Sequence, residues 1–409
     1  TTISYYNGNS LDVETISSYP HSIGLFYSAM TSFLGFKPNE GEYKLMGLSS
    51  YGKKTHMFNK LNKLVKFEYD KIICNLKYFE WDKSDTVMYN YNLSELLGML
   101  PRLPHEEITQ KHKDLAYAVQ KTYEMVFFDL LNYVHEKYDT QNICLGGGCA
   151  YNGLANGKIY KQTKFTNLWI PPAPSDAGSS VGSVINYRVS KGKKVSIPKT
   201  PFLGPSYRIN SKFKKHLKDR KYIYLEKSDL LFSVVSKEIR RGKVVGFFRD
   251  EIEFGSRALG NRSILADPTN PNMKNRINEL VKRREGFRPF APMVTKEGQH
   301  KFFHMFEDVP YMNQVVRVKG DYVDELKAVT HVDGTSRVQT VDRSNFIHGL
   351  LMEYEKQTGY PILLNTSFNI KDKTIVLTPD DALKTFDEVD IDVLVLQNYI
   401  IFKKTKKYV

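Results

Sequence analysis

Cysteines and long apolar runs are both scarce in this chain, and each shortage excludes a class of protein. Only Cys74, Cys144 and Cys149 occur among 409 residues. They lack metal-ligand spacing and cannot all pair, so a disulfide-stabilised secreted scaffold is excluded and a reducing, cytoplasmic location is expected. No apolar run approaches the roughly 18 residues that a membrane-spanning helix needs, so we expect no membrane partner.

Acidic residues are also scarce relative to basic ones. The chain has 59 Lys and Arg against 45 Asp and Glu, a formal net charge of +14. Such a charge favours anionic partners, such as nucleotides, phosphates or nucleic acid, without choosing among them. The hydrophobic content of 41% and the lack of low-complexity tracts are typical of a folded globular protein.

The length predicts two or three domains. The segment Lys191–Ser206 is rich in lysine, proline and glycine, which is typical of a linker. We therefore predict domains at residues 1–195 and 196–409. Because the chain starts at Thr1 without a methionine, we also expect a longer natural protein whose N-terminal part is absent here.

Helical and strand patterns alternate in both halves, which predicts a mixed α/β fold. The expected helices are Ile23–Leu34, a long one within Glu106–Tyr138, Asp229–Arg240 and Pro379–Phe386. The expected strands are Lys243–Phe248, Tyr311–Val318, Arg337–Val341, Pro361–Leu364 and Asp392–Phe402. Phe67–Tyr91 alternates aromatic and charged residues, as in a small sheet or an insertion.

The basic, glycine-containing stretch Glu253–Pro292 is the strongest functional signal. Its cations are Arg257, Arg262, Lys274, Arg276, Lys282, Arg283, Arg284 and Arg288. The first of them stand beside Gly255 and Gly260, where guanidinium forks and backbone N–H groups can bind the same oxyanion. A solvated basic surface explains the later cations well but explains GSRALGNRS poorly. We therefore predict an anion site in this stretch.

Two strand–turn–helix patterns in the first half have two interpretations each. Asn142–Leu145 is followed by Gly146, Gly147 and Gly148 and by a helix-compatible stretch from Cys149 to Lys161. This pattern is either a phosphate cradle at a helix start or a tight turn without a ligand. In WIPPAPSDAG, Asp176 is either a helix cap or a metal ligand.

Taken together, the motifs resemble the NodU/CmcH-type O-carbamoyltransferase family. In the first half the residues that carry the resemblance are SIGLFYSAMTSFLGF, GEYKLMGLSSYG, CLGGGCAYNGLANGKI and PPAPSDAGSSVGS. In the second half they are EFGSRALGNRSILADP, REGFRPFAP, VTHVDGTSRVQTV and LLNTSFN. They follow the family's order and leave mainly Lys60–Glu106 unmatched.

The resemblance implies a fold and a reaction. The first domain is expected to be an N-terminally incomplete actin/sugar-kinase-like ATP-binding domain, and the second a YrdC-like α/β domain. Carbamoyl phosphate and ATP would give carbamoyl-adenylate, and a hydroxylated sugar or natural product would accept the carbamoyl group. ATP and a divalent metal ion of the iron or magnesium type are the implied cofactors, and a homodimer is one compatible assembly.

The resemblance also implies site residues. The expected catalytic residues are Arg257, Arg262, Arg288 and His331. The expected substrate- and nucleotide-binding residues are Gly146, Gly147, Gly148, Asn152, Lys282, Arg284, Asp333, Arg337, Asn365, Thr366, Ser367 and Asn369. Asp176 is the expected metal ligand.

Two other functions compete with this interpretation. The same domain types occur in tRNA threonylcarbamoylation, in which threonine and bicarbonate would replace carbamoyl phosphate. A non-catalytic nucleic-acid-binding protein would explain the positive charge and the many aromatic residues. Against nucleic acid, the cations lie among glycines and not along one helix or strand face.

Overall fold

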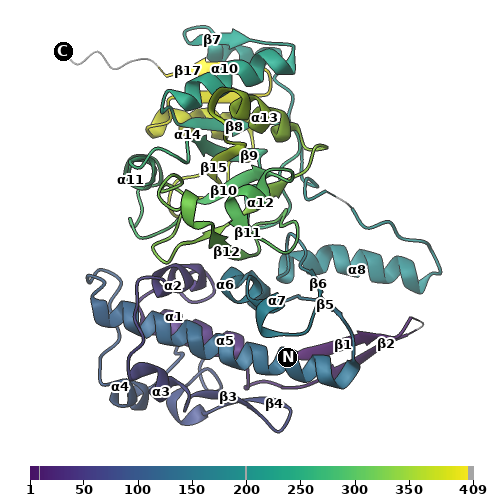
Figure 1. The fold of residues 1–409 in the computed structure, drawn as a ribbon, viewed down its shortest axis with the longest axis vertical. Helices are drawn as coiled ribbons and strands as arrows, with labels where there is room; N and C mark the ends of the chain where they lie inside the picture. The colour runs from purple at the N-terminus through teal and green to yellow at the C-terminus, as the bar shows by residue number, and fades with distance from the viewer. Residues whose placement is uncertain (9, 199, 404–409) are drawn as a thin grey trace. The chain divides into compact units, whose positions relative to one another are not determined.

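The computed structural model describes residues 1–8, 10–198 and 200–403. Contacts divide the chain into two compact units, Thr1–Ile170 and Pro171–Val409 (Figure 1). Helix α8 (Asp176–Ser190) falls in the second unit, whereas the predicted boundary after residue 195 placed it in the first. It has no buried residue. Along the described ranges, no helix combines the length and the apolar character needed to cross a membrane.

The first unit is built on the long helix α5 (Gln110–Tyr138), against which α1 (Ile23–Phe33), α2 (Glu42–Ser49) and α3 (Met57–Leu61) pack (Figure 1). The buried face of α5 includes Leu115, Val119, Tyr123, Val126 and Leu131, at the helical spacing that the sequence predicted. The predicted helix over Ile23–Leu34 is likewise confirmed by α1.

Short helices and two-stranded sheets complete the first unit. The helices are α4 (Tyr91–Leu97), α6 (Gly153–Asn156) and α7 (Ile159–Gln162), with 3-10 turns η1 (Leu76–Tyr78) and η2 (Gly148–Tyr151). The sheets are antiparallel β1 (Thr2–Tyr6) with β2 (Leu11–Thr15), antiparallel β3 (Val65–Glu68) with β4 (Lys71–Cys74), and parallel β5 (Asn142–Cys144) with β6 (Asn167–Trp169).

The helix predicted from Cys149 to Lys161 does not form as one element. The chain instead makes η2, α6 and α7 in succession. Asn152 starts a new helix by accepting a hydrogen bond from the backbone N–H of Ala155, and Gly157 ends it. A side-chain cap and a glycine within a few residues therefore divide the stretch.

The second unit contains a mixed sheet with the strand order β14–β10–β15–β9–β8–β16–β17–β7. Its strands are β7 (Lys221–Tyr224), β8 (Val245–Phe248), β9 (Arg262–Ala266), β10 (Ala291–Thr295), β14 (Gln339–Val341), β15 (Ile362–Ser367), β16 (Val393–Leu396) and β17 (Tyr399–Phe402). β8 pairs parallel with β16 and β10 pairs parallel with β14, while the other neighbours are antiparallel.

Apolar layers cover both faces of this sheet. On one face, α10 (Ser228–Arg240) and α13 (Phe346–Thr358) bury residues such as Leu231 and Leu350 against the strands. On the other face, α14 (Pro379–Glu388), the π-helical turn η4 (Ile277–Lys282) and a small sheet of β11 (Phe303–His304), β12 (Val315–Val318) and β13 (Thr335–Arg337) enclose a second core.

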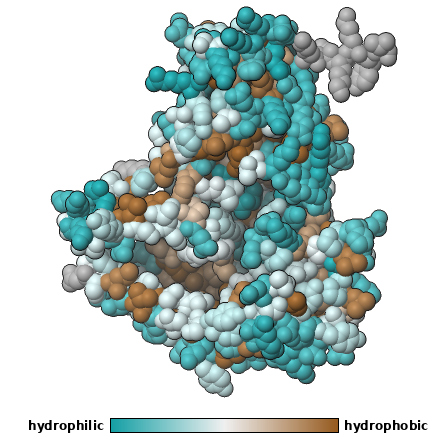
Figure 2. All heavy atoms as spheres, turned by 180° about the vertical axis from the view of Figure 1, so that it is seen from behind, coloured by the Kyte–Doolittle hydropathy of each residue, from teal (hydrophilic) through white to brown (hydrophobic). Residues whose placement is uncertain are grey.

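The remaining elements are short: α9 (Ser211–Lys214), η3 (Lys215–Leu217), α11 (Met273–Arg276), α12 (Gln299–Phe302) and η5 (Gly320–Tyr322). Two strands predicted in this unit are divided. Arg337–Val341 was predicted as one strand, but β13 ends at Arg337 and β14 begins at Gln339, in different sheets. Asp392–Phe402 was predicted as one strand, but the chain reverses between β16 and β17, where Gln397 adopts a positive φ of 53°. Figure 2 shows hydrophilic residues over most of the visible surface, with apolar residues in separate patches.

Candidate active site

A loop between β8 and β9 presents the first predicted cation, Arg257. One oxygen of the buried Glu253 carboxylate, Oε1, accepts the backbone N–H groups of Leu259, Asn261 and Arg262 at 2.7, 2.8 and 3.2 Å. Gly255 adopts a φ of 132°, and a Cβ there would lie 2.5 Å from the carbonyl oxygen of Pro172. The carboxylate and the glycine together fix the loop around Arg257.

Arg262 is not presented to solvent, although the sequence placed it among the catalytic cations. Its side chain is fully buried, and its guanidinium donates to the carbonyl oxygens of Arg249, Asn261 and Asp250 at 2.5, 2.9 and 3.1 Å. It also lies 3.6 Å from the centre of the Phe248 ring. Burial lowers the pKa of Arg262 to about 10, and Glu253 opposes this shift. These donors therefore bind backbone, and tie the loop to the end of β8.

Four other guanidinium groups of the second unit act on one another. Burial holds the pKa of Arg337 well below its usual range, and the positive charges of Arg257, Arg284 and Arg288 lower it further. We call these four residues, together with Lys282, the cation cluster. Mutual repulsion among positive charges is relieved when an anion binds between them, so the arrangement is suited to a polyanionic ligand.

Lys282 is the buried member of the cation cluster, with 2% of its surface exposed. Its Nζ donates to the carbonyl oxygens of Ser367 and Asn369, at 2.5 and 3.1 Å, and to their side-chain oxygens, at 3.1 and 2.6 Å. Burial and then the charges of Arg284 and Arg288 hold its pKa well below the usual range. Lys282 therefore joins the end of η4 to the end of β15.

Arg284 and Arg288 are held in defined orientations. The Nε of Arg284 donates to Oδ1 of Asn278 at 2.7 Å, and its guanidinium carbon lies 4.8 Å from the centre of the Phe290 ring. The Nη1 of Arg288 lies 3.6 Å from Oε2 of Glu285. Such fixed guanidinium groups can stabilise developing charge on a phosphate without large rearrangement.

His331, Asp333 and Arg337 lie on one turn and the strand that follows it. Thr335 donates its hydroxyl hydrogen to Oδ1 of Asp333 at 2.6 Å, so its oxygen can accept from Nδ1 of His331, 3.2 Å away. This pattern leaves the proton on Nδ1 and a lone pair on Nε2. Burial lowers the pKa of His331 to about 4, and Asp333 opposes this shift, so the imidazole is neutral near pH 7.

The side chains of the predicted motif NTSFN (Asn365–Asn369), which begins on β15, point to both faces of the sheet. Asn365 and Ser367 share one face, because side chains alternate along a strand, and Thr366 points to the other. The Oγ of Ser367 lies 2.6 Å from Oδ1 of Asn369. The strand therefore sends Asn365 and Ser367 toward one side and lets Asn369 meet Lys282 just beyond its end.

Several buried polar atoms of this region have no hydrogen-bond partner within the described residues. They include Ser263 Oγ, His331 Nε2, Arg337 Nε and Asn365 Oδ1. Buried polar atoms without partners are rare in folded proteins and mark strain, function or a bound molecule. Arg337 belongs to the cation cluster and its charge acts on His331, so the unpartnered Nε of Arg337 and Nε2 of His331 indicate a site that can receive a polar ligand.

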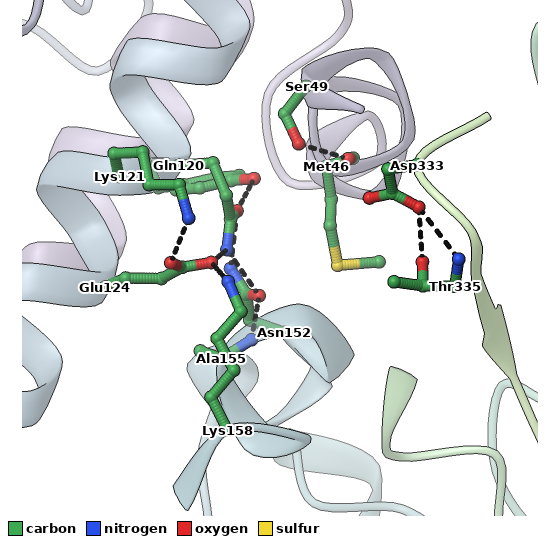
Figure 3. Close-up of polar contacts among 11 residues, drawn as sticks. Met46, Ser49, Gln120, Lys121, Glu124, Asn152, Ala155, Lys158, Asp333 and Thr335 are labelled. Carbon is green, nitrogen blue, oxygen red and sulfur yellow. Dashed lines mark hydrogen bonds and ion pairs between the residues drawn. The ribbon is translucent and has the colours of Figure 1, made fainter. Parts of the chain in front are cut away.

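The first unit holds the predicted glycine loop. Gly146, Gly147 and Gly148 are exposed, and a Cβ on any of them would meet open space. Asn152, which was predicted to bind phosphates, instead exchanges hydrogen bonds of 3.0 and 3.1 Å with Gln120 and caps α6 (Figure 3). Because the helices after the loop have four residues each, they offer little dipole to an anion.

Asp176 is exposed at the first position of α8. In the described part of the chain, no group of three or more His, Cys, Asp or Glu side chains could hold a metal ion. The residues present therefore do not form a metal site around Asp176.

Sequence reasoning missed two groups of polar residues. Glu253 and Gln339 organise the second unit's site, and Glu253 stood at the start of the recognised stretch. In the first unit, the buried Glu124 accepts from Gln120 at 3.1 Å and pairs with Lys121 and Lys158 (Figure 3). The sequence signal for this second group was Glu124 itself, a carboxylate on the apolar face of a predicted helix.

Comparisons with known proteins agree across both units. Residues 1–185 match the family model described as Carbamoyltransferase N-terminus, and residues 236–403 match Carbamoyltransferase C-terminus. An uncharacterized protein of Synechocystis sp. is 37% identical over 97% of this chain and 69% of its own length. Nodulation protein NolNO of Sinorhizobium fredii is 34% identical over 97% of this chain and 58% of its own length.

Other matches add two points. Nodulation protein NolO of Bradyrhizobium diazoefficiens is 32% identical over 97% of this chain and 72% of its own length. The chain thus spans 58% to 72% of these three relatives. The crystal structure of full-length HypF in its phosphate- and nucleotide-bound form aligns with 43% of this chain and 22% of its own, at 19% identity and a TM-score of 0.31. That likeness is too limited to carry an argument.

Proposed function

The chain belongs to the carbamoyltransferase family, and from that premise we propose that it forms carbamoyl-adenylate from carbamoyl phosphate and ATP. The carbamoyl group then passes to a hydroxyl of a sugar or natural product. The second unit is proposed to be the YrdC-like, adenylate-forming part. The first is proposed to be part of an actin/sugar-kinase-like transfer domain, with its open glycine loop toward a nucleotide.

The cation cluster is the observation that carries this proposal. Burial and then the charges of three arginines lower the pKa of a fourth, Arg337, and the buried Lys282 feels the charges of two of them, Arg284 and Arg288. This density of partly buried positive charge matches substrates that bring a phosphate and a triphosphate together. A solvated surface patch would not bury its lysine at 2% exposure.

The proposed reaction balances in three steps. Water cleaves carbamoyl phosphate to carbamate and inorganic phosphate, breaking the bond between the carbamoyl group and the phosphate. A carbamate oxygen then attacks the α-phosphorus of ATP, forming the adenylate as the bond to pyrophosphate breaks. In the last step the acceptor hydroxyl attacks the carbamoyl carbon, AMP leaves, and the hydroxyl proton is lost.

The residues of the second unit have distinct parts in this scheme. Arg257, Arg284, Arg288 and Arg337 hold the phosphate oxygens and stabilise the charge that develops on them. The unprotonated Nε2 of His331 accepts a hydrogen bond from the attacking water or from substrate. ATP fits the charge of the site, whereas no step is assigned to a metal ion, because Asp176 lacks companion ligands among the described residues.

Pyrophosphate release tests the proposal. We expect release that requires both ATP and carbamoyl phosphate and that falls at least about 100-fold in Arg257→Ala. Arg241→Ala is the matched control, because Arg241 is an exposed arginine whose one side-chain partner in the described part of the chain is Glu238 of α10. Release that requires threonine in place of carbamoyl phosphate would establish threonylcarbamoyl chemistry instead. No pyrophosphate release with either set of substrates, both from this chain and from a protein as long as the relatives, would overturn the carbamoyl and the threonylcarbamoyl proposals.

A further inference from the structure

The second unit contains a cavity that no step of the proposed reaction uses. Its volume is about 720 Å³, which lies in the usual range for sites that hold a small molecule. Its walls come from residues 200–202, the loop between β8 and β9, strand β14 at the edge of the large sheet, the loop between β11 and β12, and the start of α13. None of the five residues of the cation cluster lines it.

The lining of this cavity is acidic, in contrast to the basic chain as a whole. Its charged members are four carboxylates and one cation: Asp250, Glu251, Asp308, Asp342 and Lys296. A surface of this kind repels phosphate groups and attracts positive ones. The cavity is therefore suited to a cationic ligand, unlike the cation cluster.

One pair of these carboxylates lies where β14 ends. Asp342 directly follows β14, and the backbone N–H of Lys296 donates to the carbonyl oxygen of Val341 at 3.0 Å. The Lys296 side chain forms an ion pair with Asp308. This hydrogen bond, with the charge of Asp342 in addition, raises the pKa of Lys296. The wall thus already holds one ammonium group at this end.

The other pair lies where β14 begins. Gln339, the first residue of β14, donates from its Nε2 to the carbonyl oxygen of Leu259 at 2.8 Å. In the same loop, Nδ2 of Asn261 donates to the carbonyl oxygen of Glu251 at 2.8 Å, and Asp250 directly precedes Glu251. The second pair of carboxylates is therefore held at the opposite end of the strand.

The length of β14 separates the two pairs. From Gln339 to Asp342 the chain advances three residues, which is roughly 10 Å along a strand. In agreement with this separation, the described ranges contain no group of three or more His, Cys, Asp or Glu side chains that could hold a metal ion. A ligand that satisfies both ends therefore needs two positive groups on one extended molecule.

The end at Glu251 also offers polar groups without partners. The Glu251 carboxylate is exposed, and no residue in the described part of the chain pairs with it. Asn261 lines the cavity with 6% of its surface exposed, yet no described residue donates to its Oδ1. Asp250 is balanced in part by Arg249, whose Nε lies 3.2 Å away. A buried amide oxygen that lines a cavity and lacks a donor points to a ligand with N–H groups.

Two buried side chains hold this end in place. Oε1 of Glu253 accepts the backbone N–H groups of Leu259 and Asn261 at 2.7 and 2.8 Å. The guanidinium of Arg262 donates to the carbonyl oxygen of Asp250 at 3.1 Å. The wall is therefore formed before a ligand binds, which lowers the entropy lost on binding.

Aromatic rings make up part of the remaining lining. Phe202 and Tyr311 pack against the same small core around Leu259. Phe346 lines the cavity as well, and the guanidinium carbon of Arg249 lies 3.5 Å from the centre of its ring. Such rings bind alkyl groups by apolar contact and attract cations to their faces. They therefore suit the apolar part of a molecule that carries ammonium groups.

We propose that this cavity binds an organic oligoamine, a molecule whose ammonium groups lie roughly 10 Å apart on a partly apolar scaffold. One ammonium group pairs with Asp342, another pairs with Glu251 beside Asn261, and the scaffold lies against Phe202 and Tyr311. A linear polyamine and an oligomer of an amino sugar share this chemistry. The proposal does not depend on the proposed reaction, because the ligand carries no phosphate and binds apart from the cation cluster.

Calorimetric titration of the whole chain with spermidine tests this proposal. Putrescine offers two ammonium groups over a shorter span, and Mg²⁺ offers charge without a scaffold. Wild type is expected to bind spermidine at least about 10-fold more tightly than either. Glu251→Gln and Asp342→Asn each remove one charge at nearly constant shape, and each is expected to weaken spermidine binding by about 5- to 10-fold. Asp324→Asn is the control, since Asp324 is exposed and pairs with Lys327 outside the cavity.

Both variants should fold. Glu251 has no ion-pair partner to lose among the described residues, and Asp342→Asn keeps the oxygen that accepts from the backbone N–H and the hydroxyl of Ser344, at 2.9 and 2.8 Å. Full spermidine affinity in either variant would overturn the proposal, because the ligand would then not reach both ends.

The remaining outcomes also decide. Mg²⁺ binding as tightly as spermidine would show unspecific attraction of charge and would overturn the proposal. The glucosamine disaccharide with two free amino groups distinguishes the two sources of the chemistry. Tighter binding of the disaccharide than of spermidine would assign the cavity to amino sugars, and weaker binding would assign it to linear polyamines. Binding of neither probe would overturn the proposal.

Discussion

Arg262 and Arg337 use the same side chain in two different ways. Arg262 gives its guanidinium hydrogens to three backbone carbonyls, so its charge is balanced by the dipoles of the loop that it anchors. Arg337 faces other guanidinium groups, whose positive charges lower its pKa beyond the effect of burial. The buried Nε of both arginines has no hydrogen-bond partner among the described residues. A cation already bound by backbone holds the fold, and one surrounded by cations is prepared for an anion.

Arg262→Lys is expected to destabilise the second unit by about 2 to 4 kcal/mol, because a lysine cannot form the same three bonds while it remains buried. Urea denaturation measures this effect, and Arg241→Lys, at the exposed residue that follows α10, should change stability by less than about 0.5 kcal/mol. Unchanged stability combined with lost phosphate binding would show that Arg262 contacts ligand directly.

His331 should make the second unit sensitive to acid. Its pKa is about 4 in the fold, below the value of about 6.5 for an unfolded chain. As pH falls from about 6.5 to about 4, the unfolded state takes up a proton that the folded state refuses, so stability is lost across that window. We expect a loss of about 1 to 3 kcal/mol, measured as the opening free energy of the amides of residues 335–341 by hydrogen exchange.

His331→Gln is the control for this prediction, because glutamine does not titrate. The stability difference between wild type and variant should be pH-independent above about pH 7 and should shrink or reverse toward pH 5. A constant difference over the whole range would contradict the assignment of a buried neutral imidazole.

Among the elements, two helix ends offer a matched pair of glycines. Gly35 follows α1 with a φ of 71°, and Gly359 ends α13 with a φ of 81°. A Cβ on Gly35 would lie 2.4 Å from the carbonyl oxygen of Arg102, whereas a Cβ on Gly359 would meet open space. Gly359→Ala should therefore cost about 1 kcal/mol and Gly35→Ala about 2 kcal/mol or more, in thermal unfolding. Equal effects would show that α1 moves away from Arg102.

The sequence predicted helices better than it predicted chain reversals. The apolar spacing in α5 and α10 was readable because each helix buries one face against a core. The reversal at Gln397 was not, because both of its strands are apolar and the turn lacks glycine or proline. The divided helices after Gly148 depend on Asn152 acting as a cap, which competes with a continuous helix pattern.

For the site, the sequence identified the cations but not their orientation. Arg257, Arg284 and Arg288 were predicted within one anion site and Arg337 as a substrate-binding residue, and in the structure the charges of the first three act on Arg337. Arg262 was grouped with them because sequence adjacency does not reveal which arginine turns inward. Glu253 and Gln339 were missed because their function depends on contacts with residues far along the chain.

At the scale of the whole molecule, the segment after α8 should be the first point of proteolysis. Lys191, Lys193 and Lys194 are exposed and lie beyond the last helical turn. Brief digestion with trypsin should cut there before it cuts after Lys282, because the Lys282 side chain is buried and hydrogen-bonded to the carbonyl oxygen of Ser367. Mass spectrometry of the fragments measures the order. Early cleavage at Lys282 would show that η4 opens more readily than the linker.

The ring of N–H groups around Glu253 has a consequence for how the loop is made. Three converging backbone N–H groups form a nest of the kind that binds small anions, and here the bound anion is the Glu253 carboxylate of the same chain. Glu253 thereby holds the loop in its conformation without substrate, so Arg257 is positioned before a ligand binds. Glu253→Ala would vacate the nest, and sulfate should then restore thermal stability in a concentration-dependent manner that a neutral osmolyte does not reproduce. The anion would be performing, from solution, the task of a side chain.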